Sequence, residues 1–254
     1  RPYEAVIADM GKTAASLLDG NGFLVADCAG VGVGSPGTID SQNGVVLYSN
    51  NIRWDNVPLA KELQKYLPVP VCVQNDCAAL GEVLCGAAKG FQNAVFLTLG
   101  TGVGGGIVIN GKIFEGGHPG GAELGHVKCG SEQRRCTCGR LDCLETYASA
   151  TALIHDAKQM AQQHPDSLLW ELCDHDLEKM NAKMPFDAAN AGDMCGKTLV
   201  DNYIQYLADG ITDLANIFRP DIIVLGGGVC AQGEKLTEPL NQYLRANCFG
   251  NTVA

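Results

Sequence analysis

The stretch AVFLTLGTGVGGGIVINGKIF, residues 94–114, carries the pattern that decides the fold class. Its apolar start predicts a strand, the glycines that follow predict a turn, and the remainder predicts a hairpin. The pair Asn110-Gly111 is the strongest short hairpin signal in a sequence, because both residues readily take the positive φ of a tight turn. Gly100, Gly102, Gly104 and Gly105 carry no side chains, so backbone amides there can approach phosphate oxygens.

The rest of the chain alternates between helical and strand patterns, without repeats or low-complexity linkers. Strands that end in glycine turns beside helix starts are where α/β proteins bind phosphate and nucleotide. The pattern predicts an α/β protein. We expect helices over 5–18, 77–88 and about 187–218. We expect a short buried strand that runs into a Gly/Pro turn over 30–40, a strand over 69–73, and a buried strand ending in three glycines over 221–229.

Length and charge exclude several classes of protein. The 254 residues can form one large domain or two moderate ones. The formal net charge of −10 argues against nucleic acid or an anionic membrane as partner, since both need a basic surface. No apolar run approaches a membrane span, and the first residues are not a secretory signal. Twelve cysteines in a chain of this length and pattern fit a reducing compartment, so we expect a soluble cytoplasmic protein.

A dense group of cysteines in residues 125–145 suggests a metal site. Four of its side chains match a tetrahedral structural zinc in number and type: His126, Cys136, Cys138 and Cys143. Cys129 is expected to be a bystander. A disulfide, or a set of ordinary buried cysteines, is the alternative. Zinc binding can contribute ~10 kcal/mol or more to local folding, which is enough to hold a loop with little core of its own.

Carboxylates flank this loop and also follow an earlier strand. Glu123 and Glu145 bracket the cysteines and could accept hydrogen bonds from the hydroxyls of a polyol; each could equally be a solvated surface charge. Asp76 stands between a strand and a helix, beside Asn75. An aspartate there can take the proton from an attacking hydroxyl in phosphoryl transfer, although a helix cap explains it equally well.

The order of motifs resembles the ROK family (repressors, open reading frames, kinases), and within it the bacterial ATP-dependent glucokinases. Glu-x-Gly-His followed by Cys-x-Cys-Gly-x-x-x-Cys-Leu-Glu is close to diagnostic. The matching pieces cover nearly the whole chain: GVGVGSPGTID, YSNNIRWDNVPLA, QNDCAALGE, LGTGVGGGIVINGKIF, GAELGHV, CTCGRLDCLETYAS, AGD at 191–193 and DIIVLGGGV.

The resemblance implies an actin-like ATPase (ribonuclease H-like) fold with two α/β lobes. Residues 1–76 would be the remainder of the N-terminal lobe, and 77–254 the C-terminal lobe with a zinc loop at 126–143. It implies ATP, Mg²⁺ and a structural Zn²⁺ as cofactors, and a homodimer or homotetramer. The general base toward the sugar's 6-hydroxyl would be Asp76. The residues that would hold the sugar are Asn51, Asn75, Asp76, Glu123, His126 and Glu145. The ATP phosphates would be approached by Gly100, Thr101 and Gly102, and the adenosine by Gly226, Gly227 and Gly228. The zinc would be bound by His126, Cys136, Cys138 and Cys143.

Three departures from the family pattern qualify the resemblance. Asp142 stands where the cysteine signature usually has a second glycine, although all three thiols remain. No Asp-x-Gly-Gly-Thr-Lys phosphate loop precedes Arg1, and Met10-Gly11-Lys12-Thr13 lies inside a helical pattern. The chain also stops before the family's final helix. These two features lead us to expect a chain trimmed at both ends, or one that has lost those segments, with little kinase activity of its own.

The expected activity is phosphorylation of a hexose, with glucose first and N-acetylated hexosamines, mannose, allose or fructose as further candidates. The alternatives are a sugar-sensing ROK-type transcriptional regulator or an inactive sugar-binding relic. A regulator of this family carries an amino-terminal helix-turn-helix and often lacks the catalytic aspartate, whereas Asp76 is present.

Overall fold

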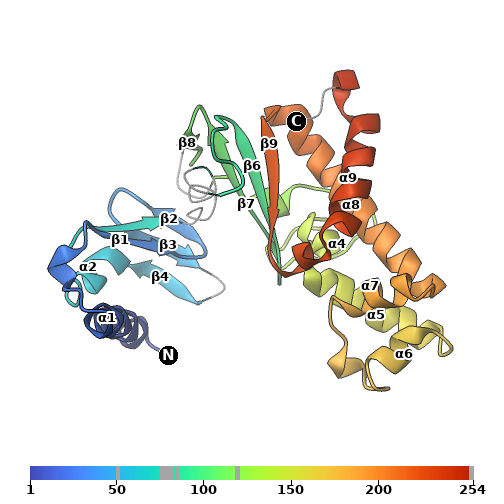
Figure 1. The fold of residues 1–254 in the computed structure, drawn as a ribbon, viewed down its shortest axis with the longest axis horizontal. Coiled ribbons are helices and arrows are strands. Elements are labelled where there is room, and N and C mark those ends of the chain that lie inside the picture. Colours follow the sequence, from blue (N-terminus) through green and yellow to red (C-terminus); the bar gives the residue numbers. More distant parts are fainter. Residues whose placement is uncertain (50–51, 75–82, 84–85, 118–120, 252–254) are drawn as a thin grey trace. The chain divides into compact units, whose positions relative to one another are not determined.

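The computed structural model describes residues 1–49, 52–74, 83, 86–117 and 121–251. Its chain divides into two compact units, residues 1–82 with 113–122 and residues 83–112 with 123–254 (Figure 1). The boundary expected between residues 76 and 77 falls outside the described residues, as does nearly all of the helix expected over 77–88. Both stay predictions.

The first unit opens with helix α1 (Tyr3–Gly20), which confirms the helix expected over 5–18. Pro2 occupies its N-cap position with extended backbone, and Glu4 lies in its first turn, where a negative charge favours a helix start. The helix ends at the Asn21 C-cap, and Gly22 takes a φ of +77° just beyond it.

Two small sheets follow α1. Strands β1 (Val31–Gly34) and β5 (Val71–Gln74) pair in parallel. Strands β2 (Thr38–Asp40), β3 (Val45–Ser49) and β4 (Trp54–Val57) form an antiparallel meander, after which the chain enters helix α2 (Leu59–Leu63). The strands expected at the start of 30–40 and over 69–73 are therefore present, although only Val33 of β1 is buried. The second strand within 30–40, β2, and the meander that it begins were not anticipated.

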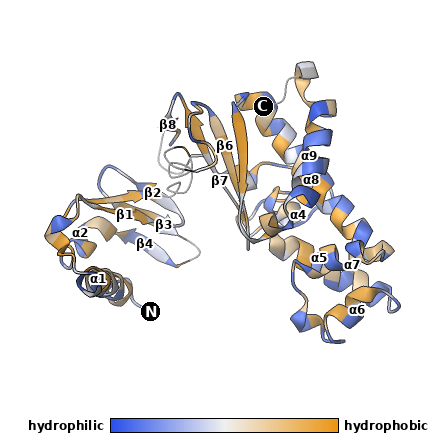
Figure 2. Ribbon diagram, in the orientation of Figure 1, coloured by the Kyte–Doolittle hydropathy of each residue, from blue (hydrophilic) through white to orange (hydrophobic). Residues whose placement is uncertain are grey.

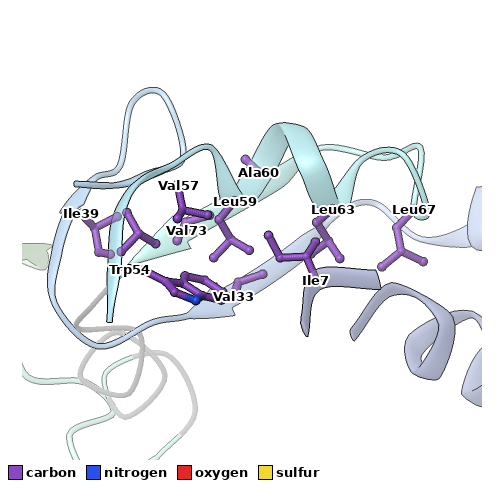
Figure 3. Packing of buried hydrophobic residues seen from close by; sticks show 11 residues of the cluster. Ile7, Val33, Ile39, Trp54, Val57, Leu59, Ala60, Leu63, Leu67 and Val73 are labelled. Atoms are coloured by element: carbon purple, nitrogen blue, oxygen red, sulfur yellow. The ribbon is translucent and has the colours of Figure 1, made fainter. Parts of the chain in front are cut away.

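Buried apolar side chains from all these elements meet in one core. Ile7 of α1 lies beside Leu63 of α2, and Trp54 and Val33 approach from the strands (Figure 3). A side chain at Gly11 would overlap Tyr66, so the close approach of α1 to the segment after α2 requires glycine there. Apolar burial of this kind is what stabilises the first unit.

The second unit is built on a four-stranded sheet in the order β8-β7-β6-β9. Strands β6 (Ala94–Leu99) and β7 (Val103–Ile109) are antiparallel, β8 (Lys112–Ile113) continues the hairpin, and β9 (Ile222–Gly226) lies parallel to β6. Asn110 and Gly111 have φ of +52° and +72°, as a tight hairpin turn requires. The strand, glycine turn and hairpin expected over 94–114 are confirmed.

The helices of the second unit lie on one side of this sheet in Figure 1, and Figure 2 shows apolar and polar residues alternating along α8 and α9. Short 3₁₀ turns connect the elements at Val25–Asp27, Leu124–His126, Leu177–Lys179, Gly228–Gln232 and Phe249–Asn251. The helices are α4 (Glu145–Ala148), α5 (Ala150–Gln163), α6 (Leu168–Leu172), α7 (Met184–Asn190), α8 (Met194–Phe218) and α9 (Glu234–Asn247).

Two sequence expectations were wrong in detail. The single helix expected over 187–218 is two helices, because Gly192 takes a φ of +87° and Asp193 caps the start of α8. The strand expected to be buried over 221–229 is only partly buried along β9, which has one neighbouring strand in the described sheet. Among the described residues, no helix combines the length and apolar character needed to cross a membrane.

Candidate functional site

Four side chains of the types that bind metals converge in the loop that precedes α4. Their ligand atoms all lie within 4.8 Å of one another. Cys138 Sγ and Cys143 Sγ are 3.7 Å apart, and Cys136 Sγ is 3.6 Å from His126 Nδ1. In a tetrahedral zinc site with the usual bond lengths, two sulfurs are roughly 3.8 Å apart and a sulfur and a nitrogen roughly 3.5 Å. The donor set and its spacing therefore fit a zinc ion, and the four residues expected from the sequence are brought together.

Backbone hydrogen bonds shape this loop. An isolated bridge pairs Lys128 with Cys143 at its base. At its tip, the Gly139 amide donates to the Cys136 carbonyl at 3.0 Å, and Gly139 has a φ of +91°, in the region that favours glycine. The chain between Cys136 and Gly139 therefore makes a tight turn that presents Cys138 to the same point as the other thiols.

The described cysteines, which exclude residues 77 and 85, form no disulfide. Burial raises the pKa of the Cys143 thiol to about 12. The backbone amide of Arg140 hydrogen-bonds to the Cys138 sulfur and lowers the pKa of that exposed thiol. Zinc binds thiolates rather than thiols, so a bound ion would have to displace the protons that these groups hold.

Glu145, the first residue of α4, points its carboxylate toward the glycine turn between β6 and β7. Its Oε2 accepts a hydrogen bond from the Val103 amide at 3.1 Å, and its Oε1 lies 3.8 Å from Cys136 Sγ. A side chain at Gly102 would overlap Oε2. The carboxylate thus lies between the thiol cluster and the glycine turn, with one oxygen anchored to the backbone.

The remaining glycines of this segment have different neighbours. Side chains at Gly104 and Gly105 would overlap Thr98 and Leu124, so strand packing accounts for both. Gly100 alone of the four glycines singled out in the sequence has open space where a side chain would be. The expectation that all four clear the way for phosphate is therefore too broad, and the role of the turn in phosphate binding stays a prediction.

A second glycine turn lies at the same edge of the sheet. Thr98 of β6 pairs with Gly226 of the parallel strand β9, so the turns after these two strands are neighbours. Gly227 has a φ of +96°, and a side chain there would overlap the Leu99 backbone. Gly226 and Gly228 face open space. Open peptide groups at the carboxyl ends of adjacent parallel strands are a common place for nucleotides to bind.

Glu123 directly precedes the 3₁₀ turn Leu124–His126. Gly125 in that turn packs against the start of β7, where a side chain would overlap the backbone. Desolvation raises the pKa of the Glu123 carboxyl; His126 opposes the rise and the charge of Glu145 adds to it. The Glu123 side chain is exposed, and its carboxyl interacts electrostatically with His126 and Glu145.

Three expected site residues, Asn51, Asn75 and Asp76, lie outside the described residues, and their roles stay predictions. The sequence analysis did not single out Val103, because a backbone amide leaves no mark in a sequence. It also missed the partners of Asp142 in the cysteine loop, although an aspartate at a position where glycine is usual was a signal that this residue has a role.

The chain belongs to the ROK family, whose profile matches residues 1–252. A glucokinase of Halalkalibacterium halodurans is 40% identical over 233 residues, which cover 90% of this chain and 70% of that protein. A glucokinase of Thermotoga maritima is 40% identical over 242 residues, covering 94% of this chain and 74% of that protein. A xylose repressor of Caldicellulosiruptor bescii is 30% identical over 87% of this chain, which spans 55% of the repressor.

Solved structures agree with this assignment. A ROK family glucokinase from Streptomyces griseus, crystallised with glucose and AMPPNP, superposes with a TM-score of 0.83 at 33% identity. The match covers 97% of this chain and 79% of the glucokinase. The α/β content and these neighbours confirm the expected actin-like ATPase fold.

Proposed function

We propose that the protein is an ATP-dependent hexose kinase that converts glucose to glucose 6-phosphate. The observation that carries the proposal is the Glu123, His126 and Glu145 cluster, set between a thiol cluster and a glycine turn in a chain 40% identical to glucokinases. The Streptomyces griseus relative was crystallised with both glucose and an ATP analogue, which supports the pairing of these two substrates.

In this proposal the polar cluster binds the sugar hydroxyls. Glu145 Oε2 is held by the Val103 amide at 3.1 Å, whereas Oε1 has only a long contact from the Cys136 thiol at 3.8 Å, so Oε1 is the oxygen that would accept from a sugar hydroxyl. Glu123 supplies a second acceptor. Asn51 and Asn75 complete the sugar site, and Asp76 accepts the proton of the 6-hydroxyl as that oxygen attacks the γ-phosphorus and ADP departs.

Zinc and the nucleotide have separate places. His126, Cys136, Cys138 and Cys143 would hold a structural zinc, which fixes the conformation of the loop between the two glutamates. The turn at Gly100, Thr101 and Gly102 would approach the ATP phosphates, and that at Gly226–Gly228 the adenosine. Mg²⁺ accompanies ATP and neutralises charge on the phosphates.

Substitution of Asp76 tests the reaction. In the full-length protein, Asp76→Asn should lower the kcat for glucose phosphorylation by at least about a hundredfold, the usual contribution of a positioned general base. Glucose affinity should change much less, because the amide can still accept one hydrogen bond. Asp166→Asn, at an exposed position, is the matched control. A coupled assay for ADP measures both, and near-normal turnover by Asp76→Asn would remove this residue as the base.

A sugar-responsive repressor is the second candidate, because the chain also matches a xylose repressor at 30% identity. The two functions separate by assay. A kinase consumes ATP in the presence of hexose, whereas a regulator binds sugar without turnover and changes its affinity for DNA. An inactive sugar-binding protein would bind sugar without consuming ATP and without any effect on DNA binding. We also propose a cytoplasmic homodimer or homotetramer, which sedimentation of the purified protein would test.

A further inference from the structure

Asp142 combines burial with an unusual backbone conformation. It directly precedes Cys143, is only 3% exposed, and has a φ of +61°. Glycine adopts that region freely, and aspartate is among the few other residues that tolerate it. The aspartate therefore preserves the turn that a glycine would make at this position, and it adds a carboxylate inside the loop.

Two hydrogen bonds reach one oxygen of the Asp142 carboxylate. Its Oδ1 accepts from the Tyr147 hydroxyl at 2.6 Å and from the Arg134 amide at 3.0 Å. Its own backbone is equally engaged, since the Asp142 amide donates to the Arg134 carbonyl and the Asp142 carbonyl accepts from the Cys129 amide, both at 2.8 Å. Asp142 Oδ1 and both backbone polar groups of this residue are thus hydrogen-bonded within residues 129–147.

Tyr147, the hydrogen-bond partner of Asp142, is also buried and makes further contacts in the loop. The side chain is 1% exposed, and its hydroxyl also accepts a hydrogen bond from the Glu132 amide at 3.1 Å. The Arg134 guanidinium lies 4.4 Å from the centre of the Tyr147 ring, and Arg134 donates to the Thr146 carbonyl at 3.1 Å. A side chain at Gly130 would overlap this ring, so the loop closes over it.

We propose that Tyr147 and Asp142 form a positioning pair that holds Glu145 and Cys143 in the geometry required for hexose binding. The hydroxyl–carboxylate bond joins the residue before Cys143 to a residue two positions after Glu145. It closes residues 142–147 into a ring that contains one proposed zinc ligand and one proposed sugar ligand. The inference rests on the proposed function, because it assigns a purpose to the position of Glu145.

Removing the Tyr147 hydroxyl tests the pair. In the full-length protein, Tyr147→Phe should raise the Kd for glucose, measured by calorimetry, about tenfold, since it deletes one hydrogen bond to a buried charged group. Release of zinc to a chromogenic chelator should accelerate about tenfold for the same reason. The variant should still contain one zinc per chain, because all four ligands remain.

Tyr206→Phe is a matched control. The Tyr206 ring packs on Tyr147 with centroids 4.4 Å apart, and its hydroxyl donates to Glu132 Oε1 at 2.6 Å. The control therefore removes a hydrogen-bonded hydroxyl next to the same loop, but not one bonded within residues 142–147. Glucose affinity and zinc release should remain within about twofold of the unmodified protein.

The Asp142 variants add a graded readout. Asp142→Asn keeps an acceptor and tolerates the positive φ, so its glucose Kd should lie between those of the unmodified protein and Asp142→Ala. A lower unfolding midpoint for Tyr147→Phe with unchanged glucose affinity and zinc release would reduce the pair to a structural contact and overturn the inference.

Glu145→Gln separates this inference from the proposed function. Weakened glucose binding in Glu145→Gln but not in Tyr147→Phe overturns the positioning role and leaves the sugar site standing. Unchanged binding in Glu145→Gln overturns the sugar site itself. In that case, accelerated zinc release from Tyr147→Phe would still support the claim that Tyr147 and Asp142 position Cys143. Unchanged zinc release would overturn this claim as well.

Discussion

In the first unit, eleven buried apolar side chains from helices and strands pack against one another (Figure 3), whereas in the loop at 126–143 only Cys136, Asp142 and Cys143 are buried. The core spreads its stabilisation over many non-directional contacts. The loop depends on a few directional ones: backbone hydrogen bonds, the Asp142 carboxylate and the proposed zinc ligands. A perturbation aimed at one kind of contact should therefore leave the other region intact.

The largest effect is expected from loss of a thiol. Cys143→Ser should remove a zinc ligand and with it on the order of 10 kcal/mol of local stabilisation, so loop amides should exchange hydrogen at least about a hundredfold faster. Mass spectrometry of exchange, with metal analysis, measures both effects. Strand β3 of the first unit should keep its protection. Cys72→Ser, an exposed cysteine in that unit, is the control. Equal protection of the loop in both variants would show that zinc does not hold it.

The converse change is a cavity in the apolar core. Leu63, which is 2% exposed, packs between α1 and the strands. Leu63→Ala should lower the free energy of unfolding by about 2–5 kcal/mol, measured by urea denaturation, while zinc content stays unchanged. Leu17→Ala, at a side chain 63% exposed, should cost less than about 0.5 kcal/mol. Loss of zinc from Leu63→Ala would mean that the two regions are not independent.

A smaller effect comes from a carboxylate that caps two helices. Asp193 accepts from the Gly196 amide at the start of α8 and from the Leu168 amide at the start of α6, at 2.7 and 2.9 Å. Asp193→Ala should therefore lower the free energy of unfolding by about 1–2 kcal/mol at pH 7.

This effect should depend on pH in a defined direction. Burial alone would raise the pKa of the Asp193 carboxyl, but hydrogen bonds from Gly196 and Leu168 outweigh it and hold the pKa below its ordinary value of 3.8. The stabilisation is then present above pH 3.8 and is lost as the pH falls through the lower, folded-state pKa. Urea titrations at pH 7 and near pH 3 measure the difference between Asp193→Ala and the unmodified protein. A difference that grows in acid would contradict the assignment.

The smallest effect is expected at Cys129, the cysteine of the loop region outside the metal set. Its thiol donates to the Tyr206 carbonyl, and burial, with the charges of Asp209 and Asp213, raises its pKa to about 11. Cys129→Ala should cost about 1 kcal/mol or less and leave zinc content unchanged. In the metal-depleted protein, iodoacetamide should modify Cys138 well before Cys129 at pH 8, which peptide mass spectrometry would show. Loss of zinc from Cys129→Ala would place this thiol among the ligands.

The convergence of His126 and the three cysteines, and the hairpin, could be predicted because their signals are local. Donor spacing around Cys136 and the pair Asn110-Gly111 depend on chemistry within a few residues. The break between α7 and α8 had a local signal too, in Gly192 and Asp193, but the apolar period continues across it and suggested one helix. The meander of β2, β3 and β4 was not predicted, because strands of three to five residues are too short to show a clear alternation of apolar and polar residues.

The arrangement around Glu145 could not be predicted, because its partners are distant in sequence. The Val103 amide that anchors the carboxylate lies 42 positions away. Sequence patterns also do not distinguish a glycine that admits a ligand from one that admits a neighbouring side chain. Gly100 and Gly104 look alike in the sequence, and only the folded neighbourhood separates them.

A substitution at Gly102 should have an effect that depends on Glu145, because the Glu145 carboxylate occupies the space beside this glycine. A mutation to alanine there would resemble a defect in the turn itself, yet the atom it displaces belongs to Glu145. A second substitution, at Glu145, should then compensate for the overlap that Gly102→Ala creates. Glu145→Asp withdraws the carboxylate by one methylene, so the double variant Gly102→Ala, Glu145→Asp should have a higher free energy of unfolding than Gly102→Ala alone, as urea denaturation would measure. Positions 102 and 145 should accordingly vary together among relatives, as a pair in which one residue is small because the other is long.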